Sequence, residues 1–501
     1  MFQHIVNSLP IIFSIKTILI MSFGVAAGIG IGAMPGLTAT MGVALLIPIT
    51  FKMSAASGLI LLGSIYCGAI YGGSISAILL KIPGTPSSIA TAYDGYPMVK
   101  KGEADKALKI AIIASTFGGL ISVIVLLFLS PPLANFALMF GAAEYFWVAM
   151  LGLSVIVSLS NSNIIKGLIS ACFGLLVGTV GIDMITGVPR FTFGNPNLLG
   201  GISVIVLLIG LYSIPQALEM IENDKVNVVH QILQRGKKTS FLEMYREVKK
   251  DIACYLRSSV LGTIIGIIPG AGGNIASFMG YEQAKRFSKE PDSFGKGAPE
   301  GLVGSEAANN GVTGGSLVPL LTLGVPGNAV SAVFLGGLII HGLQPGPRLF
   351  AEHGDIVYTF IVSLFFVNII MLFMGYYGAY IFAKVTKVPN SIVGPLVIVL
   401  SIVGSYAINN NIFDSAMMLL FGFIGYSMKK AGIDPGPAVL GLILGPMAEE
   451  NWRKAMMISG GSLNIMFEGS INWLLSGLVI ISLTFGIISF FKSKVKIDET
   501  D

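Results

Sequence analysis

The sequence predicts an all-α polytopic membrane protein with about 10–14 membrane helices, counting broken and re-entrant segments, of roughly 20 residues per full span. Hydrophobic residues make up 53% of the 501 residues and charged residues only 11%, whereas a soluble protein carries about a quarter charged residues. The mean hydropathy is +0.81. Apolar runs long enough to cross a bilayer recur along the chain, for example at residues 110–129, 198–221, 356–383 and 473–491.

The composition also narrows the kinds of site to expect. The 63 glycines suit close packing between membrane helices, because small residues let two backbones approach. Cys67, Cys172 and Cys254 lie in or beside apolar segments, without the Cys or His spacing of a disulfide framework or a metal site. The net charge of +5 does not indicate nucleic acid as a partner. No cofactor is expected other than Na⁺ in the role of a coupling ion.

Lysine and arginine collect in a few hydrophilic segments, as they do in cytoplasmic loops. The expected organisation is a first membrane half at residues 1–222, a cytoplasmic linker at 223–256, a second half at 257–491 and a cytoplasmic tail at 492–501. The first residues lack a basic leader and a small-residue cleavage site, which predicts a retained first helix. The alternation of inside and outside loops along the chain then places the N-terminus outside.

The two halves share an internal repeat. Residues 28–40, "GIGIGAMPGLTAT", align with residues 262–274, "GTIIGIIPGAGGN". Residues 71–88, "YGGSISAILLKIPGTPSS", align with residues 313–331, "TGGSLVPLLTLGVPGNAVS", with one inserted residue. Single Gly and Pro matches are weak evidence, but two motifs that recur in the same order indicate a duplication.

The charges that flank the two repeats predict opposite orientations in the membrane. The first repeat ends in the basic "MVKKGEADKALK", which places its end inside. The second begins after the basic linker, hence inside, and ends in "HGLQPGPRLFAEHGD", where acidic residues outnumber the single arginine. Inverted repeats are typical of secondary transporters, whose substrate site lies where the repeats meet.

Each repeat contains two Pro-Gly pairs that are expected to break membrane helices. They are Pro35-Gly36, Pro83-Gly84, Pro269-Gly270 and Pro326-Gly327. In lipid such breaks persist only inside protein or beside water, because the freed backbone groups need partners. After Gly36 only about 15 apolar residues follow, or ~22 Å of helix, which is shorter than the ~30 Å core and predicts a half-helix.

The residues after these breaks are suited to binding an anion. Thr85 stands at an N-cap position, Pro86 at the first helical position, and Asn328 is expected to cap the equivalent helix of the second repeat. Because a helix N-terminus offers unpaired N–H groups, four converging starts predict a polar cavity for a small carboxylate; ordinary kinks are the alternative. The candidate substrate-binding residues are Pro35, Gly36, Thr38, Thr40, Pro83, Gly84, Thr85, Ser87, Ser88, Gly270, Asn274, Pro326, Gly327 and Asn328.

Four other polar residues each have two interpretations. Glu306, Asn309 and Asn310 could hold Na⁺ or, at Glu306, a proton; a position of Glu306 at the membrane interface is the alternative. Lys81 could provide a counter-charge for an anionic substrate or, as we favour, extend to the membrane surface.

Three further segments are expected to be structural. Asp183 and Arg190 lie in "GIDMITGVPRFTFGNPN", which we interpret as a solvated connector outside the membrane. "AEENWRKA", residues 448–455, is expected to be a loop followed by a helix start, with its glutamates near Arg453 at the surface. "DGYP", residues 94–97, is expected to turn the chain toward the cytoplasmic loop.

Motifs that run from residue 24 to residue 460 carry a family resemblance. They are "GAMPGLTATMGVALLIPITF", "GAIYGGSISAILLKIPGTPSSIATAYDGYPMVKKGEADKAL", "GVPRFTFG", "IIPGAGGNIASFMGYEQAKRFSK", "EAANNGVTGGSLVPLLTLGVPGN" and "LGLILGPMAEENWRKAM". Through them the chain resembles the large membrane subunit of the tripartite tricarboxylate transporters.

This resemblance implies a bacterial inner-membrane permease that takes up a di- or tricarboxylate such as citrate, by symport with Na⁺ or H⁺ and with an elevator-like motion. It implies two partners, a small membrane subunit and a periplasmic substrate-binding protein. Lys81 departs from the family, which has a small neutral polar residue there, and the added cation would favour a more acidic ligand.

The sequence leaves two other functional classes to compare with a transporter. A membrane channel or scaffold without coupled transport would share the apolar pattern. An intramembrane enzyme is disfavoured, because the sequence shows no nucleophile–base pair, paired aspartates or His-Glu-x-x-His motif. We therefore expect that the chain is not an enzyme.

Overall fold

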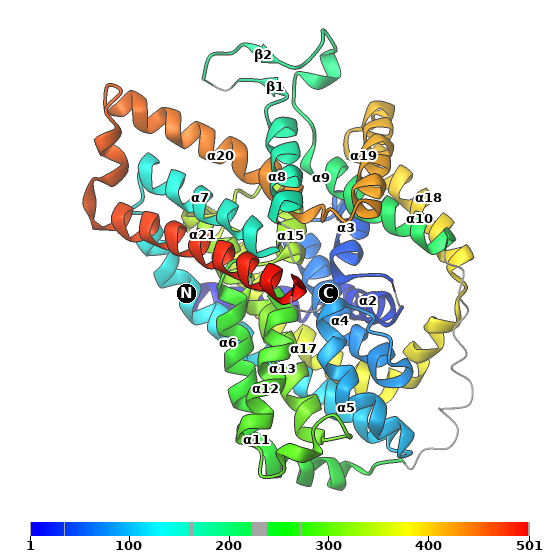
Figure 1. Cartoon of the computed structure of the whole chain (residues 1–501). Helices are drawn as coiled ribbons and strands as arrows, with labels where there is room; N and C mark the ends of the chain where they lie inside the picture. Colours follow the sequence, from blue (N-terminus) through cyan, green and yellow to red (C-terminus); the bar gives the residue numbers. More distant parts are fainter. Residues whose placement is uncertain are drawn as a thin grey trace. The chain divides into compact units, whose positions relative to one another are not determined.

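The computed structural model describes residues 2–34, 36–159, 164–183, 185–222, 238–270 and 272–498 (Figure 1). The chain divides into two compact units. Unit 1 comprises Met1–Ala134 and Gln216–Gly404, and unit 2 comprises Asn135–Pro215 and Ser405–Asp501. Each unit therefore contains segments from both halves of the sequence.

Unit 1 is built from helices, which are assigned here to the unit that holds most of their residues. The α-helices are α1 Phe2–Ile12, α2 Ile15–Ala33, α3 Ala39–Thr50, α4 Ala55–Leu80, α5 Ile89–Lys100, α6 Ala104–Ala137, α10 Ile214–Glu222, α11 Phe241–Ile267, α12 Gly272–Phe287, α13 Pro299–Gly315, α14 Leu317–Leu323, α15 Ala329–Ile340, α16 Pro347–Glu352, α17 Gly354–Ala383 and α18 Asn390–Asn409. The short 3-10 helices are η1 Pro86–Ser88, η4 Pro291–Ser293 and η5 Lys384–Lys387.

Unit 2 contains fewer helices and a small sheet. Its helices are α7 Ala142–Leu159, α8 Ile164–Gly178, η2 Pro196–Leu198, α9 Val204–Leu208, the π-helix η3 Ile209–Ser213, α19 Ile412–Lys430, α20 Gly436–Ile458, η6 Leu463–Phe467 and α21 Gly469–Asp498. Strands β1 Gly181–Ile182 and β2 Pro189–Arg190 pair antiparallel, with Gly181 opposite Arg190. Helix α20 packs against α7 and α8, and the hairpin continues beyond the end of α8 (Figure 1).

The helices confirm the all-α polytopic membrane fold. Within the described residues, six helical segments are long and apolar enough to cross a membrane. They are Ile15–Ala33, Ala55–Leu80, Ala104–Ala137, Val204–Glu222, Gly354–Ala383 and Ser391–Asn409. Shorter apolar helices include α3 and α15, each of 12 residues. The half-helix predicted after the first Pro-Gly pair is therefore present as α3.

Helices stop at the Pro-Gly pairs, as the sequence predicts. Helix α2 ends at Ala33, α4 at Leu80, α11 at Ile267 and α14 at Leu323, and a new helix begins a few residues after each. Pro35 itself lies outside the described residues. The helices that lead into the second break of each repeat form the centre of unit 1. Residues 57–79 of α4 and residues 301–315 of α13 are all buried.

The two repeats show the same packing around their breaks. Helix α2 lies along α4 in the first, and α11 lies along α13 in the second. A Cβ on Gly84 would lie 2.0 Å from the carbonyl oxygen of Gly32, and a Cβ on Gly327 would lie 2.7 Å from that of Gly266. Both breaks thus require glycine because a second backbone passes too close for any side chain.

Two predicted segments differ from the sequence interpretation. Helix α11 begins at Phe241 with a Ser240 capping box, so the second half of the expected linker is helical. Residues 223–237, which include the basic Lys225 and Arg235, lie outside the described residues. The prediction of a loop for "AEENWRKA" is wrong, because residues 448–455 continue α20 without interruption. Ala, Glu, Arg and Lys all have high helix propensity, and the prediction underweighted it.

Candidate functional site

The N-terminus of α12 lies beside the starts of both η1 and α15. A Cβ on Gly273 would be 3.1 Å from Cβ of Ser87, and a Cβ on Gly272 would be 3.9 Å from Cβ of Asn328. The backbone N–H of Gly270 donates to the carbonyl of Gly327 at 2.8 Å. Three of the four predicted helix starts therefore meet in unit 1.

These three starts are capped differently. Asn328 caps α15, since its Oδ1 accepts from the N–H of Ser331 at 2.8 Å, while its Nδ2 donates to the hydroxyl of Tyr66 at 2.9 Å. Thr85 occupies the predicted N-cap position, but its hydroxyl pairs with that of Ser87 at 3.2 Å instead of capping the helix. The buried Ser88 donates to the carbonyl of Thr85.

The start of α12 is the least satisfied of the three. Among the described residues, no side-chain hydrogen bond caps it, and Asn274 is exposed in its first turn. The first N–H groups of this 16-residue helix have no intrahelical acceptor. This helix end can therefore attract an anion.

The fourth predicted helix start belongs to α3. Thr38 caps this helix by accepting from the N–H of Met41 at 3.3 Å, and Thr40 is buried. Gly36 is exposed, with a left-handed φ of 95°. Helix α3 packs against α15. The start of α3 therefore lies on the α15 side of the three helix starts that meet at α12. The remaining candidates Pro83, Pro326 and Gly327 are half-buried or buried backbone positions at the breaks.

Asn309 of α13 is fully buried at the meeting point of η1 and α12. Its Oδ1 would lie 2.8 Å from a Cβ on Gly273, the residue whose Cβ would also contact Ser87. Neither Oδ1 nor Nδ2 of Asn309 has a hydrogen-bond partner among the described residues. A buried amide group without a hydrogen-bond partner costs about 1–3 kcal/mol. Such groups are unusual in folded proteins unless a ligand supplies the missing partner.

Glu306, one helical turn earlier on α13, is also fully buried. Its carboxylate accepts from the hydroxyl of Thr91 on α5 and from that of Ser115 on α6, the latter at 2.9 Å. Asn310 donates to Ser115 at 2.8 Å, while its own Oδ1 has no partner among the described residues. Glu306 is thus inside the protein and not on an exposed membrane boundary.

The segment "DGYP" does not form the predicted turn. Residues 94–97 are inside α5, and Asp94 is fully buried. Its Oδ1 accepts from the backbone N–H groups of Gly297 and Ala298 at 2.7 and 2.8 Å, and its Oδ2 accepts from Tyr281 at 2.9 Å. Asp94 therefore fastens α5 to the start of α13 and to α12.

Lys81 ends α4 in a left-handed conformation, with φ of 59°. Its side chain is exposed and makes no ion pair within the described part of the chain. Among the described residues, no hydrogen bond or ion pair joins the Lys81 side chain to Asn309, and its role as a counter-charge stays a prediction.

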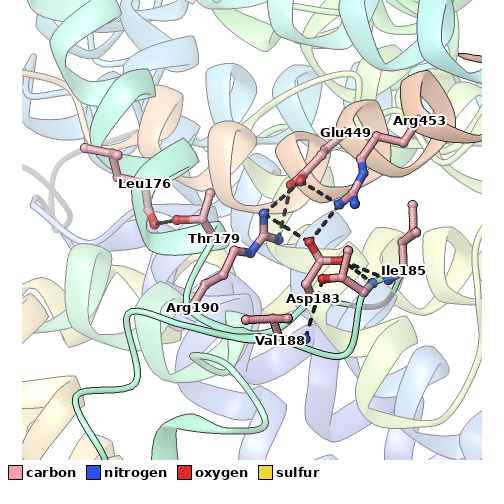
Figure 2. Close-up of polar contacts among 9 residues, drawn as sticks. Leu176, Thr179, Asp183, Ile185, Val188, Arg190, Glu449 and Arg453 are labelled. Carbon is pink, nitrogen blue, oxygen red and sulfur yellow. Dashed lines mark hydrogen bonds and ion pairs between the residues drawn. The ribbon is translucent and has the colours of Figure 1, made fainter. Parts of the chain in front are cut away.

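A second polar cluster lies in unit 2, where the expected connector is exposed at residues 185–189 but its charged residues Asp183 and Arg190 form ion pairs (Figure 2). Asp183 is only 6% exposed and pairs with Arg453 of α20 at 2.7 Å. Arg190 of β2 pairs with Glu449 at 2.8 Å, and Glu449 also pairs with Arg453 at 3.3 Å. The predicted proximity of Glu449 and Arg453 is confirmed, but the pair fixes the hairpin to α20.

The ionised carboxylate of Asp183 is stabilised by hydrogen bonds as well as by opposite charge. Its Oδ1 accepts from the N–H groups of Ile185 and Thr186 at 2.8 and 3.0 Å. These N–H groups, led by Thr186, together with Arg453, hold the pKa of Asp183 far below its usual range. Every charge in this cluster has an opposite charge beside it, which indicates a structural role.

The sequence interpretation did not select Thr91, Ser115 or Tyr66 as functional residues. Ser115 is a single hydroxyl inside a long apolar run, and in lipid such a hydroxyl needs a partner. Its partner Glu306 lies 191 positions away, so no local pattern reveals the contact. Within the described residues, no group of three or more His, Cys, Asp or Glu side chains could hold a metal.

Comparisons with known proteins agree with this architecture. Residues 18–440 match the model of the tripartite tricarboxylate transporter TctA family. An uncharacterized 52.8 kDa protein in the TAR-I ttuC' 3'region of Agrobacterium vitis is 37% identical over 450 residues, covering 89% of this chain and 88% of the relative. An uncharacterized protein in the TAR-II ttuC' 3'region of the same organism is 34% identical over 233 residues, 46% of this chain and 96% of its own. No solved structure matches the chain.

Proposed function

Because the chain belongs to the tripartite tricarboxylate transporter TctA family, we propose that this large membrane subunit takes up a di- or tricarboxylate, citrate-like in chemistry, using a Na⁺ or H⁺ gradient. Asn309 is the observation that carries the proposal. It is buried and adjacent to two helix starts, and neither of its amide atoms has a hydrogen-bond partner among the described residues.

A carboxylate at this position would satisfy the unpaired donor Nδ2 of Asn309, whereas Oδ1, the atom nearest Gly273, is an acceptor and needs a different donor. Nδ2 of Asn309, the first N–H groups of α12 and the hydroxyl of Ser87 are donors, and a carboxylate is a pure acceptor. The helix start adds a partial positive charge without requiring a buried lysine or arginine. Additional carboxyl groups of the substrate would extend toward the exposed Asn274.

The proposal includes the wider assembly. A small membrane subunit and a periplasmic substrate-binding protein would complete the transporter in a bacterial inner membrane, with the linker and C-terminus in the cytoplasm. The binding protein would deliver the carboxylate to the helix starts of unit 1. An elevator-like displacement of these starts is the proposed motion, since broken helices around a central site are typical of secondary transporters.

Uptake into vesicles that carry the complete complex tests this function. The wild type should accumulate at least one member of a panel of di- and tricarboxylates when a Na⁺ or pH gradient is imposed. Asn309→Asp places a negative charge beside the substrate and should lower uptake by roughly two orders of magnitude. Asn328→Ala and Thr85→Ala should also reduce it.

Ser57→Ala is the matched control, because Ser57 is buried in α4 with a hydroxyl partner of its own, Ser54. It should keep uptake within about twofold of the wild type. Equal, negligible effects of all four substitutions would contradict the proposed site. Flux that dissipates the gradient would indicate a channel instead of a coupled transporter.

A further inference from the structure

The consecutive helices η1 and α5 face α13 at three polar levels. At the first level, Ser87 and Asn309 both approach Gly273. At the second, Thr91 donates to Glu306. At the third, Asp94 accepts from the N–H groups of Gly297 and Ala298. The numbering rises along one helix as it falls along the other, so the two run antiparallel.

The three levels differ in how completely their groups are paired. The third level is closed, since both oxygens of Asp94 have donors. The first level has unpaired donor and acceptor atoms on Asn309. At the second level, the carboxylate of Glu306 has only hydroxyl donors among the described residues. Nδ2 of Asn310 donates to the same Ser115 hydroxyl, and Oδ1 of Asn310 has no partner in this part of the chain. The second level therefore lacks positive charge.

The titratable groups on the helices around Glu306 do not supply that charge. They include Cys67 and Tyr71 of α4, Asp94 of α5, Lys109 of α6, Cys254 and Tyr255 of α11, and Tyr281 of α12. Of these, Tyr71 interacts electrostatically with Glu306, and Lys109 pairs with Asp105. An ionised carboxylate buried without a cation is strongly unfavourable.

We propose that Glu306 and the free Oδ1 of Asn310 bind a monovalent cation, Na⁺ or a proton, and that this is the coupling site of the transporter. The inference rests on the proposed function. Carboxylate, amide and hydroxyl oxygens are the ligands that a hard cation prefers. A proton satisfies the same carboxylate by making it a donor.

The position of this site explains how cation and substrate can be coupled. Asn309 and Glu306 are three residues apart on α13, a rise of about 4.5 Å. On the opposite segment, Ser87 of η1 and Thr91 of α5 are four residues apart. A cation at the second level therefore neutralises Glu306 next to the anion at the first level, which favours binding the two together. Without the cation, Glu306 repels the incoming carboxylate.

The test separates binding of the cation from transport. Purified chain is heated in NaCl, in choline chloride, and across pH 5.5 to 8.5 in choline chloride, as wild type and as Glu306→Gln, which keeps the shape without the charge. A Na⁺ site gives wild-type stabilisation by NaCl alone, and a proton site gives stabilisation at low pH alone. Either response should vanish in the variant. Asn310→Ala should weaken a Na⁺ response and leave a proton response.

Vesicles with the complete complex give the transport readout. In Glu306→Gln, gradient-driven accumulation of the carboxylate should fall roughly tenfold or more. A variant that keeps both the wild-type cation response and full gradient-driven accumulation would overturn the inference. If the wild type accumulates no carboxylate but shows the Glu306-dependent cation response, the proposed substrate fails and the cation site stands.

Discussion

Asp94 of α5 and Glu306 of α13 are two fully buried carboxylates on facing helices, and their negative charges are compensated in different ways. Asp94 lies at the start of α13, where two backbone N–H groups and the helix dipole stabilise negative charge. Glu306 lies inside α13, where the backbone donors are used within the helix, and receives only two side-chain hydroxyls.

The difference teaches how to separate a structural acid from a functional one in a membrane protein. Burial alone does not distinguish them, since both side chains are inaccessible. The hydrogen-bond donors around each carboxylate do distinguish them. The donors around Asp94 compensate its negative charge without a ligand. The negative charge of Glu306, in the proposal above, is compensated only when a cation or a proton is bound. Asp183 in unit 2 extends the comparison, because it is paired by arginine as well as by backbone N–H groups.

Removing Asp94 should have the largest effect on stability. Asp94→Ala leaves two N–H groups and the Tyr281 hydroxyl without partners, at about 1–3 kcal/mol each, so the free energy of unfolding should fall by several kcal/mol. Asp94→Asn keeps the Oδ1 that serves both N–H groups and should cost less. Thermal unfolding of purified protein measures both. A Glu306→Gln variant less stable than Asp94→Ala would reverse the comparison.

Crowding the Asp94 level should have the next largest effect. A Cβ on Gly301 would lie 2.3 Å from Oδ2 of Asp94. Gly301→Ala gains up to about 1 kcal/mol of helix propensity but meets an overpacking cost of about 1–3 kcal/mol, so the net change should be destabilising. Gly30→Ala in α2 meets no atom within 4 Å and is the matched control, which should be neutral or stabilising. If both variants change the free energy of unfolding in the same direction, the surroundings of Asp94 are not tightly packed.

Asp183 allows the paired state to be tested by pH, because it lies in a loop outside the membrane helices. Its folded-state pKa is depressed, first by the N–H of Thr186 and then by Arg453, so the stabilisation is present above the unfolded pKa of about 3.9. It is lost as pH falls below that value. The melting temperature should therefore be insensitive to this group from pH 8 to about pH 5 and decline in acid.

Asp183→Asn is the control for that titration. It should lower the melting temperature by a few degrees at neutral pH, because Arg453 loses an ionic partner, and should flatten the acid-side decline. Equal acid sensitivity of the variant and the wild type would assign the decline to other carboxylates.

The sequence predicted local features of the site better than its long-range contacts. Pro-Gly pairs and the Asn328 cap follow from backbone sterics and short-range hydrogen bonding, and the structure has them where they were expected. Asp94 was assigned to a turn, because its partners Gly297 and Ala298 are about 200 positions away. The Thr91–Glu306 contact is missed for the same reason, because its two residues are also far apart in the sequence. Such pairings depend on how helices pack, which periodicity does not encode.

The smallest stability effect should come from Asn309, and it is the most diagnostic of a ligand site. Asn309→Leu is nearly isosteric and removes two unpaired polar groups, so without substrate it should be neutral or stabilising by up to about 1–2 kcal/mol. Asn310→Leu is the matched control on the next residue of α13. It should be destabilising, because Ser115 loses the amide that donates to it. Thermal unfolding without carboxylate gives the comparison.

The same pair of variants also separates a ligand site from a packing defect. Addition of the transported carboxylate should raise the melting temperature of the wild type but not that of Asn309→Leu, since the variant lacks the amide donor. If Asn309→Leu is as destabilising as Asn310→Leu, the amide has partners in the folded protein. The polar groups of Asn309 would then all have partners, as those of Asp94 do, and the anion would have to bind elsewhere among the helix starts.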